Sequence, residues 1–395
     1  MKFADYAPQF DRTFPLTNPQ LSWRQLLCNP QIARKLEQWR GLPLREVTGL
    51  ELARAPMKQK LSSEIEDRIR SSFVQGFQNL VLWNGHFQPG LSQMQGPVAV
   101  ILTASADENN MAAERVELHC RPGEKCFLHL LSGHDLGHHF FNYEIDLTIP
   151  NQANCQVLHS CKSTGKASLH LGRLAVAIGT SASLEIVRQQ DLGNDEFDFF
   201  RTEISLADDA NLHHLALIKG GQLTRHDIEL RLRGDRSLAR ASGLFRLDGS
   251  QTCDHHLTTH VQGKNAVTDQ LYKGILDGKS RGIFNGRIVI EPSADGASSE
   301  QLNRNLLLSG TAEADSQPQL EIQTDNVKAT HGSATGPLAG EEIFYLQSRG
   351  LAEEKAKDLL TQSFMTEIFE RIESSALKAA ARNWLRRKDA EVEER

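Results

Sequence analysis

The sequence predicts a mainly β protein in which a solenoid of short strands lies between helical regions at both ends. From about residue 97 to 337, short segments alternate apolar and polar residues, and no convincing helical stripe interrupts them. These segments recur with a regular period, whereas apolar residues in both flanks recur at helical steps. We therefore divide the chain into an N-terminal mainly helical region (1–96), a β core (97–337) and a C-terminal helical region (338–395).

The N-terminal region begins with a predicted helix that ends at Gly41 and Pro43, two residues that interrupt helices. A second helix is expected over residues 65–73, followed by an apolar strand over residues 80–83 that closes on an Asn-Gly turn signal. The first helix is predicted from apolar residues that recur at three- and four-residue steps: Trp23, Leu26, Leu27, Ile32, Leu36 and Trp39.

The core shows a repeat that is longer than a single strand and its turn. The segments Ala153-Asn154-Cys155, Ala182-Ser183-Leu184 and Ala210-Asn211-Leu212 each open a strand after a polar or small-residue turn, at steps of 29 and 28 residues. A β-sandwich would show turns every 8 to 12 residues, roughly, without this longer period. The repeat fits one coil of a β-solenoid in which each coil covers its neighbour. The helical flanks are then expected to cover the open end edges.

The C-terminal region returns to a helical pattern. Residues 341–348 predict a short helix that stops at Gly350, and a longer amphipathic helix follows from Ala352. One stripe of this longer helix is formed by apolar residues at every fourth position: Leu360, Phe364, Ile368 and Ile372.

Composition excludes several classes of function. The chain has 395 residues, a formal net charge of −6 and a pI near 6.2, so no nucleic-acid footprint is expected. No apolar run approaches the roughly 20 residues of a membrane span, and the first residues do not resemble a secretory signal. We therefore expect a cytoplasmic protein. The six cysteines contain no CxxC motif, and we interpret them as buried, inert thiols: Cys28, Cys120, Cys126, Cys155, Cys161 and Cys253.

Residues 274–280, with the sequence GILDGKS, imitate a phosphate-binding loop. The true motif has four residues between its first glycine and Gly-Lys-Ser, so that backbone N–H groups can surround a phosphate. Here three residues intervene, and residues 283–290 predict a strand rather than the required helix. We interpret the segment as strand–turn–strand and expect no ATP hydrolysis by this chain.

Two histidine pairs with a four-residue spacing are weak candidates for metal ligands. On a strand, residues two or four apart share one face, but neither pair has the intervening Glu of a zinc-protease helix or an identifiable third ligand. Core or solvent-facing histidines are the preferred interpretation. The pairs are His134 with His138 and His256 with His260.

Adjacent acidic residues raise the alternative of a β-helix enzyme that cleaves polysaccharides. These residues are neighbours in sequence rather than matched on one strand face, and they lie at expected turns or helix starts, where acidic residues are common. No catalytic site stands out among them, and a metal-free structural adaptor is a further alternative. The pairs are Asp195-Glu196, Asp208-Asp209 and Glu341-Glu342.

Several segments of the C-terminal half together resemble the SufB/SufD family of iron–sulfur cluster assembly proteins. The most specific segment is residues 325–336, with the sequence DNVKATHGSATG, and it is supported by residues 320–322, 343–351, 284–289 and 301–309. Residues 80–85 resemble an N-terminal strand of the SufD branch, and His331 followed by Gly332 favours that branch over SufB.

The resemblance implies a right-handed parallel β-helix flanked by N-terminal and C-terminal α-helical regions. It also implies a non-catalytic subunit of a SufBCD complex that supports iron acquisition and cluster assembly, while SufC supplies the ATPase. Expected partners are SufB, through the β-helix, and SufC, through the stripe of Leu360, Phe364, Ile368 and Ile372. A homodimer is expected when the chain is alone, and neither nucleic acid nor a membrane is an expected partner.

His331 is the metal-ligand candidate that the resemblance supplies. Many SufD chains have Cys-x-His-Gly where this one has Ala329-Thr330-His331-Gly332, so any ligand role rests on the imidazole. An imidazole can ligate an iron–sulfur cluster when a partner provides thiolates. The isolated chain is thus expected to bind no cofactor, with a cluster at the interface with SufB.

Overall fold

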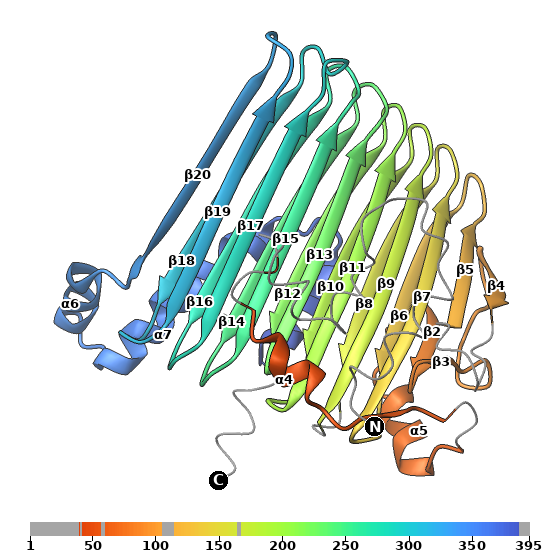
Figure 1. The fold of residues 1–395 in the computed structure, drawn as a ribbon, viewed down its shortest axis with the longest axis horizontal. Coiled ribbons are helices and arrows are strands. Elements are labelled where there is room, and N and C mark those ends of the chain that lie inside the picture. Colours follow the sequence, from red (N-terminus) through yellow and green to blue (C-terminus); the bar gives the residue numbers. More distant parts are fainter. Residues whose placement is uncertain (1–38, 40–41, 57–59, 105–113, 164–166, 387–395) are drawn as a thin grey trace.

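The computed structural model describes residue 39 and residues 42–56, 60–104, 114–163 and 167–386. Consecutive strands of the solenoid pass alternately between two sheets, and most neighbours within each sheet are parallel (Figure 1). From one end to the other, the first sheet contains β4 (Val98–Ala104), β5 (Glu114–Cys120), β7 (His139–Ile149), β9 (Ser168–Ile178), β11 (Glu196–Leu206), β13 (Leu223–Leu232), β15 (Thr252–Val261), β17 (Arg281–Ile290) and β19 (Glu313–Ile322), with β1 (Ala53–Arg54) beside β7.

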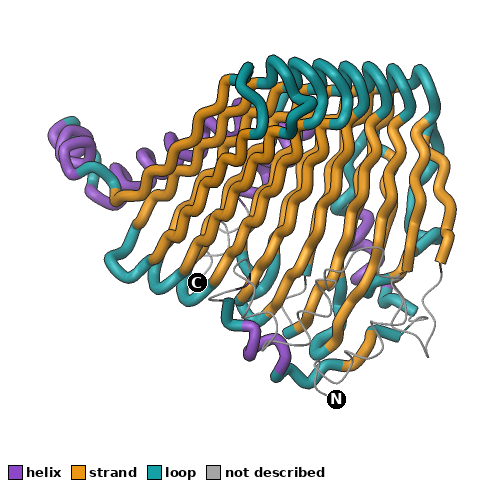
Figure 2. Tube along the Cα trace, turned by 45° about the horizontal axis from the view of Figure 1, so that its top comes forward, coloured by secondary structure: helices purple, strands orange, loops and turns teal. Residues whose placement is uncertain are grey.

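The second sheet faces the first and runs in the same direction along the solenoid. Its turns align with those of the first sheet along the two long edges of the molecule (Figure 2). In order it contains β3 (His86–Phe87), β2 (Gln78–Trp83), β6 (Lys125–Gly133), β8 (Asn154–Lys162), β10 (Ser183–Asp191), β12 (Asn211–Lys219), β14 (Leu238–Leu247), β16 (Val267–Leu276), β18 (Ser298–Leu307) and β20 (Lys328–Pro337).

The predicted repeat is confirmed and corresponds to one coil. Asn154, Ser183 and Asn211 open successive strands of the second sheet and lie in register. The residue before each of these strands is a buried alanine. Just before each alanine, the chain turns through a left-handed conformation, with φ of 62° at Gln152, 55° at Ser181 and 55° at Asp209.

The main core lies between the two sheets. Because the strands are parallel and in register, identical positions of successive coils stack into columns. Leu147, Val176, Ile204 and Leu230 form one such column and are all buried. Burial of each large apolar side chain contributes about 1.5–3 kcal/mol, so the columns account for much of the stability of the solenoid.

Helices cover the outer faces of both sheets. Helices α7 (Glu353–Glu370) and α8 (Ser375–Arg386) pack on the second sheet, where Lys219 donates a hydrogen bond to the carbonyl of Trp384 at 2.6 Å. Helix α4 (Leu44–Thr48) and Trp39 pack on the first sheet, and the guanidinium of Arg225 lies over the Trp39 ring at 3.9 Å. Helix α5 (Ser63–Arg70) lies near the first coils, and α6 (Gly340–Ser348) projects beyond the last one (Figure 1).

Three details of the sequence-based prediction change. Strand β2 already belongs to the second sheet, so the solenoid begins before the predicted boundary at residue 97. The predicted long C-terminal helix is two helices, because α7 ends at Glu370 and α8 begins at Ser375. The predicted first helix lies outside the described residues except for its last apolar residue, Trp39. Within the described part of the chain, no helix is long and apolar enough to cross a membrane.

Candidate functional site

The segment that resembles a phosphate-binding loop, residues 274–280, spans the turn between two strands, as predicted. Strand β16 ends at Leu276, β17 begins at Arg281, and Gly278 takes a φ of 63° at the corner between them. The N–H of Lys279 donates to the carbonyl of Gly249 in the preceding coil at 2.6 Å. This N–H group is therefore bonded to the neighbouring coil and is not free for a phosphate. A strand follows the turn, so no helix N-terminus is presented to a phosphate there.

Neither histidine pair forms a shared site. His134 and His138 lie in the connection between β6 and β7 rather than on one strand, and His138 takes a φ of 57°. His256 and His260 do share a face of β15, but each faces its own carboxylate: Asp254 at 3.0 Å and Glu291 at 3.6 Å. The four-residue spacing alone therefore does not indicate metal binding here.

The cysteines within the described residues are buried, as predicted, while Cys28 lies outside them. Cys120, Cys126 and Cys155 come together in the core, with 3.8 Å between the sulfur atoms of Cys120 and Cys155. Cys161 lies apart from this group, near His170. The parity of the cysteine spacing could not reveal this grouping, because it joins β5, β6 and β8.

The acidic pairs differ from the expectation in one case. Asp208 and Asp209 occupy an exposed turn, where Asp209 pairs with Arg236 at 2.7 Å. Glu341 and Glu342 lie in the first turn of α6. Glu196 was expected in a solvated turn but is fully buried, because it opens β11 with its side chain toward the interior.

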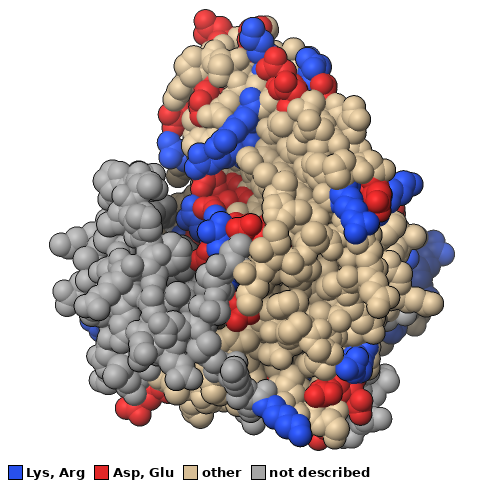
Figure 3. Space-filling model, turned by 90° about the vertical axis from the view of Figure 1, so that its right-hand side faces the viewer, with Lys and Arg blue, Asp and Glu red and all other residues tan. Residues whose placement is uncertain are grey.

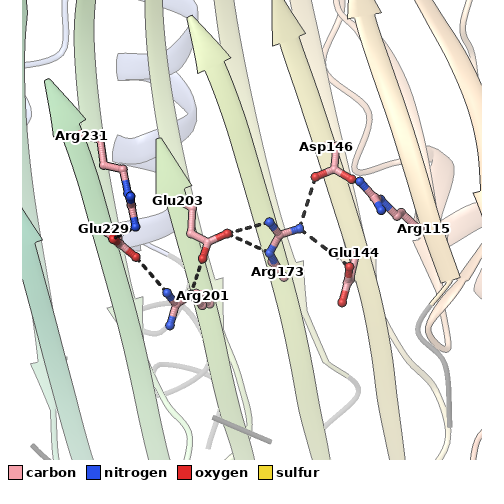
Figure 4. A network of polar contacts seen from close by, with 8 residues as sticks. All are labelled: Arg115, Glu144, Asp146, Arg173, Arg201, Glu203, Glu229 and Arg231. Atoms are coloured by element: carbon pink, nitrogen blue, oxygen red, sulfur yellow. Dashed lines mark hydrogen bonds and ion pairs between the residues drawn. The ribbon is translucent and has the colours of Figure 1, made fainter. Parts of the chain in front are cut away.

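A row of alternating charges crosses the outer face of the first sheet. It joins five coils, from β5 to β13, and borders a groove of about 490 Å³ (Figure 4). Acidic and basic side chains gather in a hollow on this side of the molecule when it is viewed from its first coils (Figure 3). The row consists of Arg115, Asp146, Glu144, Arg173, Glu203, Arg201, Glu229 and Arg231.

The charges of this row neutralise one another. Arg173 contacts Glu203 at 2.6 Å and Asp146 at 3.2 Å, and Arg201 contacts Glu203 at 2.7 Å. Burial alone would raise the pKa of Glu203, but Arg201 and Arg173 outweigh it and hold the pKa below its usual range. A glycoside-cleaving enzyme needs one carboxylic acid that stays protonated near neutral pH. Glu203 is therefore not the protonated acid that such an enzyme needs.

Polar groups also occupy the interior between the sheets. Arg188 and Asp198 form a fully buried pair at 2.8 Å. Burial lowers the pKa of His214 to about 4 and that of His255 to about 3, so both imidazoles are neutral at neutral pH. The sequence did not reveal this group, because strands that are buried on both faces show no clear alternation.

His331 lies at the open end of this interior. It is on β20, in register with Gln301, which in turn is in register with Gln270, and both glutamines are buried between the sheets. His331 continues this column but is exposed, because no further coil covers it. Ala329 precedes it on the same face and packs partly against the core. The imidazole thus stands at the mouth of the solenoid interior.

The backbone of His331 faces outward as well. The N–H of Lys328 donates to the carbonyl of Ala297 at 3.0 Å, so Lys328 faces the neighbouring strand β18. Successive residues of a strand direct their backbone groups to opposite sides. The N–H and C=O groups of Ala329, His331, Ser333 and Thr335 therefore point to the free edge of β20.

Strand β19, the other terminal strand of the last coil, differs. The N–H of Glu313 donates to the carbonyl of Ser280 at 3.0 Å, so the even-numbered residues of β19 face the free edge. Pro318 occupies one of these outward positions and has no N–H to offer. Proline and charged residues on an edge strand prevent pairing with another chain. Strand β19 is protected in this way near its middle, whereas β20 carries a charge only at Lys328 and a proline only at Pro337, its two end residues.

The predicted stripe for SufC is divided between the core and the surface. Ile368 and Ile372 are buried against the second sheet and are not available to a partner. Phe364 is half-buried, with the ammonium of Lys273 4.4 Å from its ring centre. Only Leu360 borders a groove open to solvent, of about 490 Å³ between α6 and α7. Its other lining residues are Glu341, Glu342, Tyr345, Leu346, Leu359 and Ser363.

Residues 134–364, more than half of the chain, match the family described as "SUF system FeS cluster assembly, SufBD core domain". The chain belongs to the SufBD family. The SufBD core begins just before β7 and ends within α7, so it includes His331, both terminal strands and α6. Strands β2 to β6 and helix α8 lie outside the matched segment.

Relatives within the SufBD family match either most of the chain or about half of it. The iron–sulfur cluster assembly protein SufD of Escherichia coli is 25% identical over 384 residues, covering 90% of this chain and 88% of that protein. A SufBD family protein of Synechocystis is 31% identical over 207 residues, and one of Mycobacterium leprae is 34% identical over 203 residues. These two matches span about half the length of each relative, 46% and 52%.

Proposed function

We propose that this chain is a non-ATPase subunit of a complex that assembles iron–sulfur clusters, joined to SufB through β20 and to SufC through α6 and α7. The full-length similarity to a SufD protein supports the type of subunit. The observation that carries the proposal is the unprotected edge of β20, because it offers a row of backbone donors and acceptors to a second chain.

Strand β20 is suited to close contact with another backbone. Its central residues, 329–336, carry no Lys, Arg, Asp or Glu. Gly332 and Gly336 lie within this stretch, and a Cβ added to Gly336 would meet no atom within 4 Å. The packing of this chain therefore does not require glycine at residue 336. Glycine within a strand often marks the approach of another backbone, and we assign that approach to SufB.

His331 would then lie at the joint between the two subunits. An imidazole can ligate iron when thiolates complete the site. The adjacent Ala329 cannot ligate, so SufB would supply the thiolates. The site would thus form only after the subunits pair, and the isolated chain would hold no cluster there.

The surface of α6 and α7 is the proposed contact for SufC. Large apolar side chains are exposed there, since Phe344 is 72% exposed, Tyr345 57% and Leu359 47%. Helix α6 has no buried residue of its own, so its apolar side chains do not serve the core of this chain. Exposed apolar groups of this size in one area are typical of a protein–protein interface.

The proposal is tested by mixing the purified chain with SufB and SufC and recording native mass spectra. We expect one assembly that contains all three proteins, with ATP turnover that depends on SufC and is unchanged by Lys279→Ala in this chain. A chain that binds neither SufB nor SufC, or that turns over glycans by itself, would contradict the proposal. ATP turnover that disappears with Lys279→Ala would show that the chain itself hydrolyses ATP.

A further inference from the structure

Three potential metal ligands converge inside the solenoid, far from the proposed interfaces. His134 follows β6, His170 lies on β9, and Glu196 opens β11. Their ligand atoms all lie within 4.8 Å of one another, and all three residues are buried. Glu196 Oε1 is 2.5 Å from His134 Nε2 and 3.7 Å from His170 Nε2. The hydroxyl of Ser168 completes the group, 3.1 Å from His134 Nε2 and 3.0 Å from Glu196 Oε1.

The hydrogen bonds around His134 leave its Nε2 atom facing Glu196 with no donor between them unless one of the two groups is protonated. His134 Nδ1 is 2.9 Å from the carbonyl oxygen of Leu136, which can only accept, so Nδ1 carries the proton. In a neutral imidazole, Nε2 is then an acceptor, yet it faces a carboxylate oxygen, which is also an acceptor. Two acceptors at this distance repel each other unless one of them carries a proton. To bind one metal ion at about 2.0–2.2 Å each, the two atoms would move apart to roughly 3 Å, and the ion would replace that proton.

His170 contributes a second unsatisfied nitrogen atom at the same place. Its Nε2 atom is buried and has no hydrogen-bond partner, although it lies beside Glu196. Such unpaired polar atoms in a protein interior are rare and require an explanation. The charge of Glu196 is also buried, and His134 and His170 are its ion-pair partners among the described residues. A carboxylate of this kind normally pairs with a cation or coordinates a metal.

We propose that His134 Nε2, His170 Nε2 and Glu196 Oε1 bind one divalent first-row transition-metal ion, Zn²⁺ or Fe²⁺, within the solenoid. Two imidazoles and one carboxylate are a common ligand set for these ions, with one or more positions left for water or a hydroxyl such as that of Ser168. The surrounding groups favour the site. The Leu136 carbonyl fixes the tautomer of His134, and the N–H of Gly193 donates to Glu196 Oε2 at 2.5 Å.

Two other buried groups of ligand atoms are weaker candidates. Cys161, His170 and Asp198 also converge, but Asp198 is already held by the guanidinium of Arg188 at 2.8 Å. Cys120, Cys126 and Cys155 lie in the apolar core, among leucine, isoleucine and valine side chains. Of the three groups, only the one at His134 contains both an imidazole with a fixed tautomer and an unpaired nitrogen.

The competing occupant of the site is a proton. Burial alone would lower the pKa of His170, but Cys161 and Glu196 outweigh it and raise the pKa to about 10. Without metal, His170 would therefore be an imidazolium paired with Glu196. The two alternatives differ in a measurable way, because metal binding displaces protons from its ligands and an ion pair alone binds no metal.

The test uses the isolated full-length chain, so its result does not depend on SufB or SufC. The chain is stripped with a chelator and titrated with Co²⁺, Zn²⁺ and, under anaerobic conditions, Fe²⁺. We expect about one ion to bind per chain. Bound Co²⁺ should show the visible d–d bands of a site with low coordination number, and added Zn²⁺ should abolish these bands. Zn²⁺ should also raise the melting temperature of the chain. Wild-type chain that binds no ion and shows no change in melting temperature would overturn the proposal.

Variants then locate the ion. His170→Gln and Glu196→Gln should each weaken Co²⁺ binding by at least about 100-fold, since the loss of a direct ligand exceeds the effect of losing an outer partner. His214→Gln is the matched control, because His214 is equally buried but outside the group, and it should leave Co²⁺ binding unchanged. Equal binding by His170→Gln and wild type, or equal loss in the control, would show that the ion binds elsewhere.

Discussion

The two ends of the solenoid differ in how well their exposed strand edges are protected against pairing with another chain. At the first end, the second sheet stops at β3, which has only two residues, and the first sheet stops at β4, which pairs with β5 in antiparallel fashion with a register shift near its end. Short edge strands and bulges both prevent pairing with other chains. At the last end, Pro318 and several acidic residues protect β19. Strand β20 has Lys328 only at its start and Pro337 only at its end, and residues 329–336 between them carry neither charge nor proline.

The same contrast applies to apolar side chains. Near the first coils, Trp83 is 3% exposed and donates from its indole N–H to Asp135 at 2.9 Å. Beyond the last coil, Phe344 of α6 is 72% exposed. One set of aromatic groups therefore stabilises the chain itself, whereas the other is available to a partner. Among the four terminal strands of the described solenoid, β20 therefore has the longest stretch of edge without charge or proline, residues 329–336, and it is the edge that we propose for a second protein.

The largest expected effect separates these two sets of aromatic groups. Trp83→Ala should lower the free energy of unfolding by about 3–5 kcal/mol, because it leaves a cavity in the core. Phe344→Ala should change it by less than about 0.5 kcal/mol, as is usual for surface positions. Urea denaturation followed by circular dichroism measures both values. A large loss of stability in Phe344→Ala would show that α6 serves the core, and the contrast would fail.

The second prediction concerns SufC. Leu359→Asp places a charge in the exposed groove between α6 and α7 and should weaken SufC binding by about 100-fold, or roughly 2.7 kcal/mol. Isothermal titration calorimetry measures the affinity. Asp358→Ala, at an exposed neighbouring position outside the groove lining, is the control. Unchanged affinity in Leu359→Asp would exclude this surface as the contact.

The third prediction contrasts buried histidines with the exposed His331. The pKa values of His214 and His255 in the folded chain, about 4 and about 3, lie below the ordinary value near 6.5. The unfolded chain therefore binds these protons more tightly, so stability is greatest above about pH 6.5 and falls as the pH decreases from there toward 4. Between pH 7 and pH 5, the preferential protonation of each histidine in the unfolded chain should lower the free energy of unfolding by about 2 kcal/mol.

Urea denaturation at both pH values measures this loss. The double variant His214→Gln with His255→Gln should lose less stability between pH 7 and pH 5 than wild type, whereas His331→Gln should behave like wild type. If the double variant and wild type show the same pH dependence, the two imidazoles are not the neutral, buried groups described above.

The smallest effect on the fold is expected at His331. His331→Ala should leave stability and binding to SufB and SufC unchanged but lower the iron and sulfide content of the reconstituted complex. His256→Ala is the matched control, since His256 lies on an outer strand face away from β20. Full cluster content in His331→Ala would show that the imidazole is not a ligand.

Local sequence signals predicted the architecture better than they predicted the sites. The alanines at 153, 182 and 210 indicated the coil length, because each occupies the same position in its coil. The resemblance in residues 325–336 indicated the family and His331. The division of the stripe at Ile368 was not predictable, because helical periodicity identifies an apolar face without saying what covers it.

The interior sites could not be predicted because they join residues that are distant in sequence. His134, His170 and Glu196 come from three coils and meet only in the folded solenoid, where β9 pairs with β11 and the segment after β6 lies beside them. Glu196 also resembled a solvated turn residue in sequence, next to Asp195 and after Gly193. Similarly, the protective role of Pro318 depends on which side of β19 its missing N–H faces, which only the hydrogen bonds of the ladder reveal.

The central claim is that the free edge of β20 receives SufB, and Ser333→Pro tests it most directly. The N–H of Ser333 faces the free edge, so proline removes one donor from that edge without breaking the ladder with β18. The preceding Gly332 has no Cβ to clash with the proline ring, and β19 already tolerates Pro318 at an outward position. Ser333→Ala is the control, because it removes the hydroxyl but keeps the N–H.

The affinity of each variant for SufB is measured by surface plasmon resonance, and its folding is checked by circular dichroism. We predict that Ser333→Pro folds like wild type but loses SufB binding by at least about 100-fold, while Ser333→Ala binds normally. Wild-type affinity in a folded Ser333→Pro chain would contradict the claim that β20 is the docking edge.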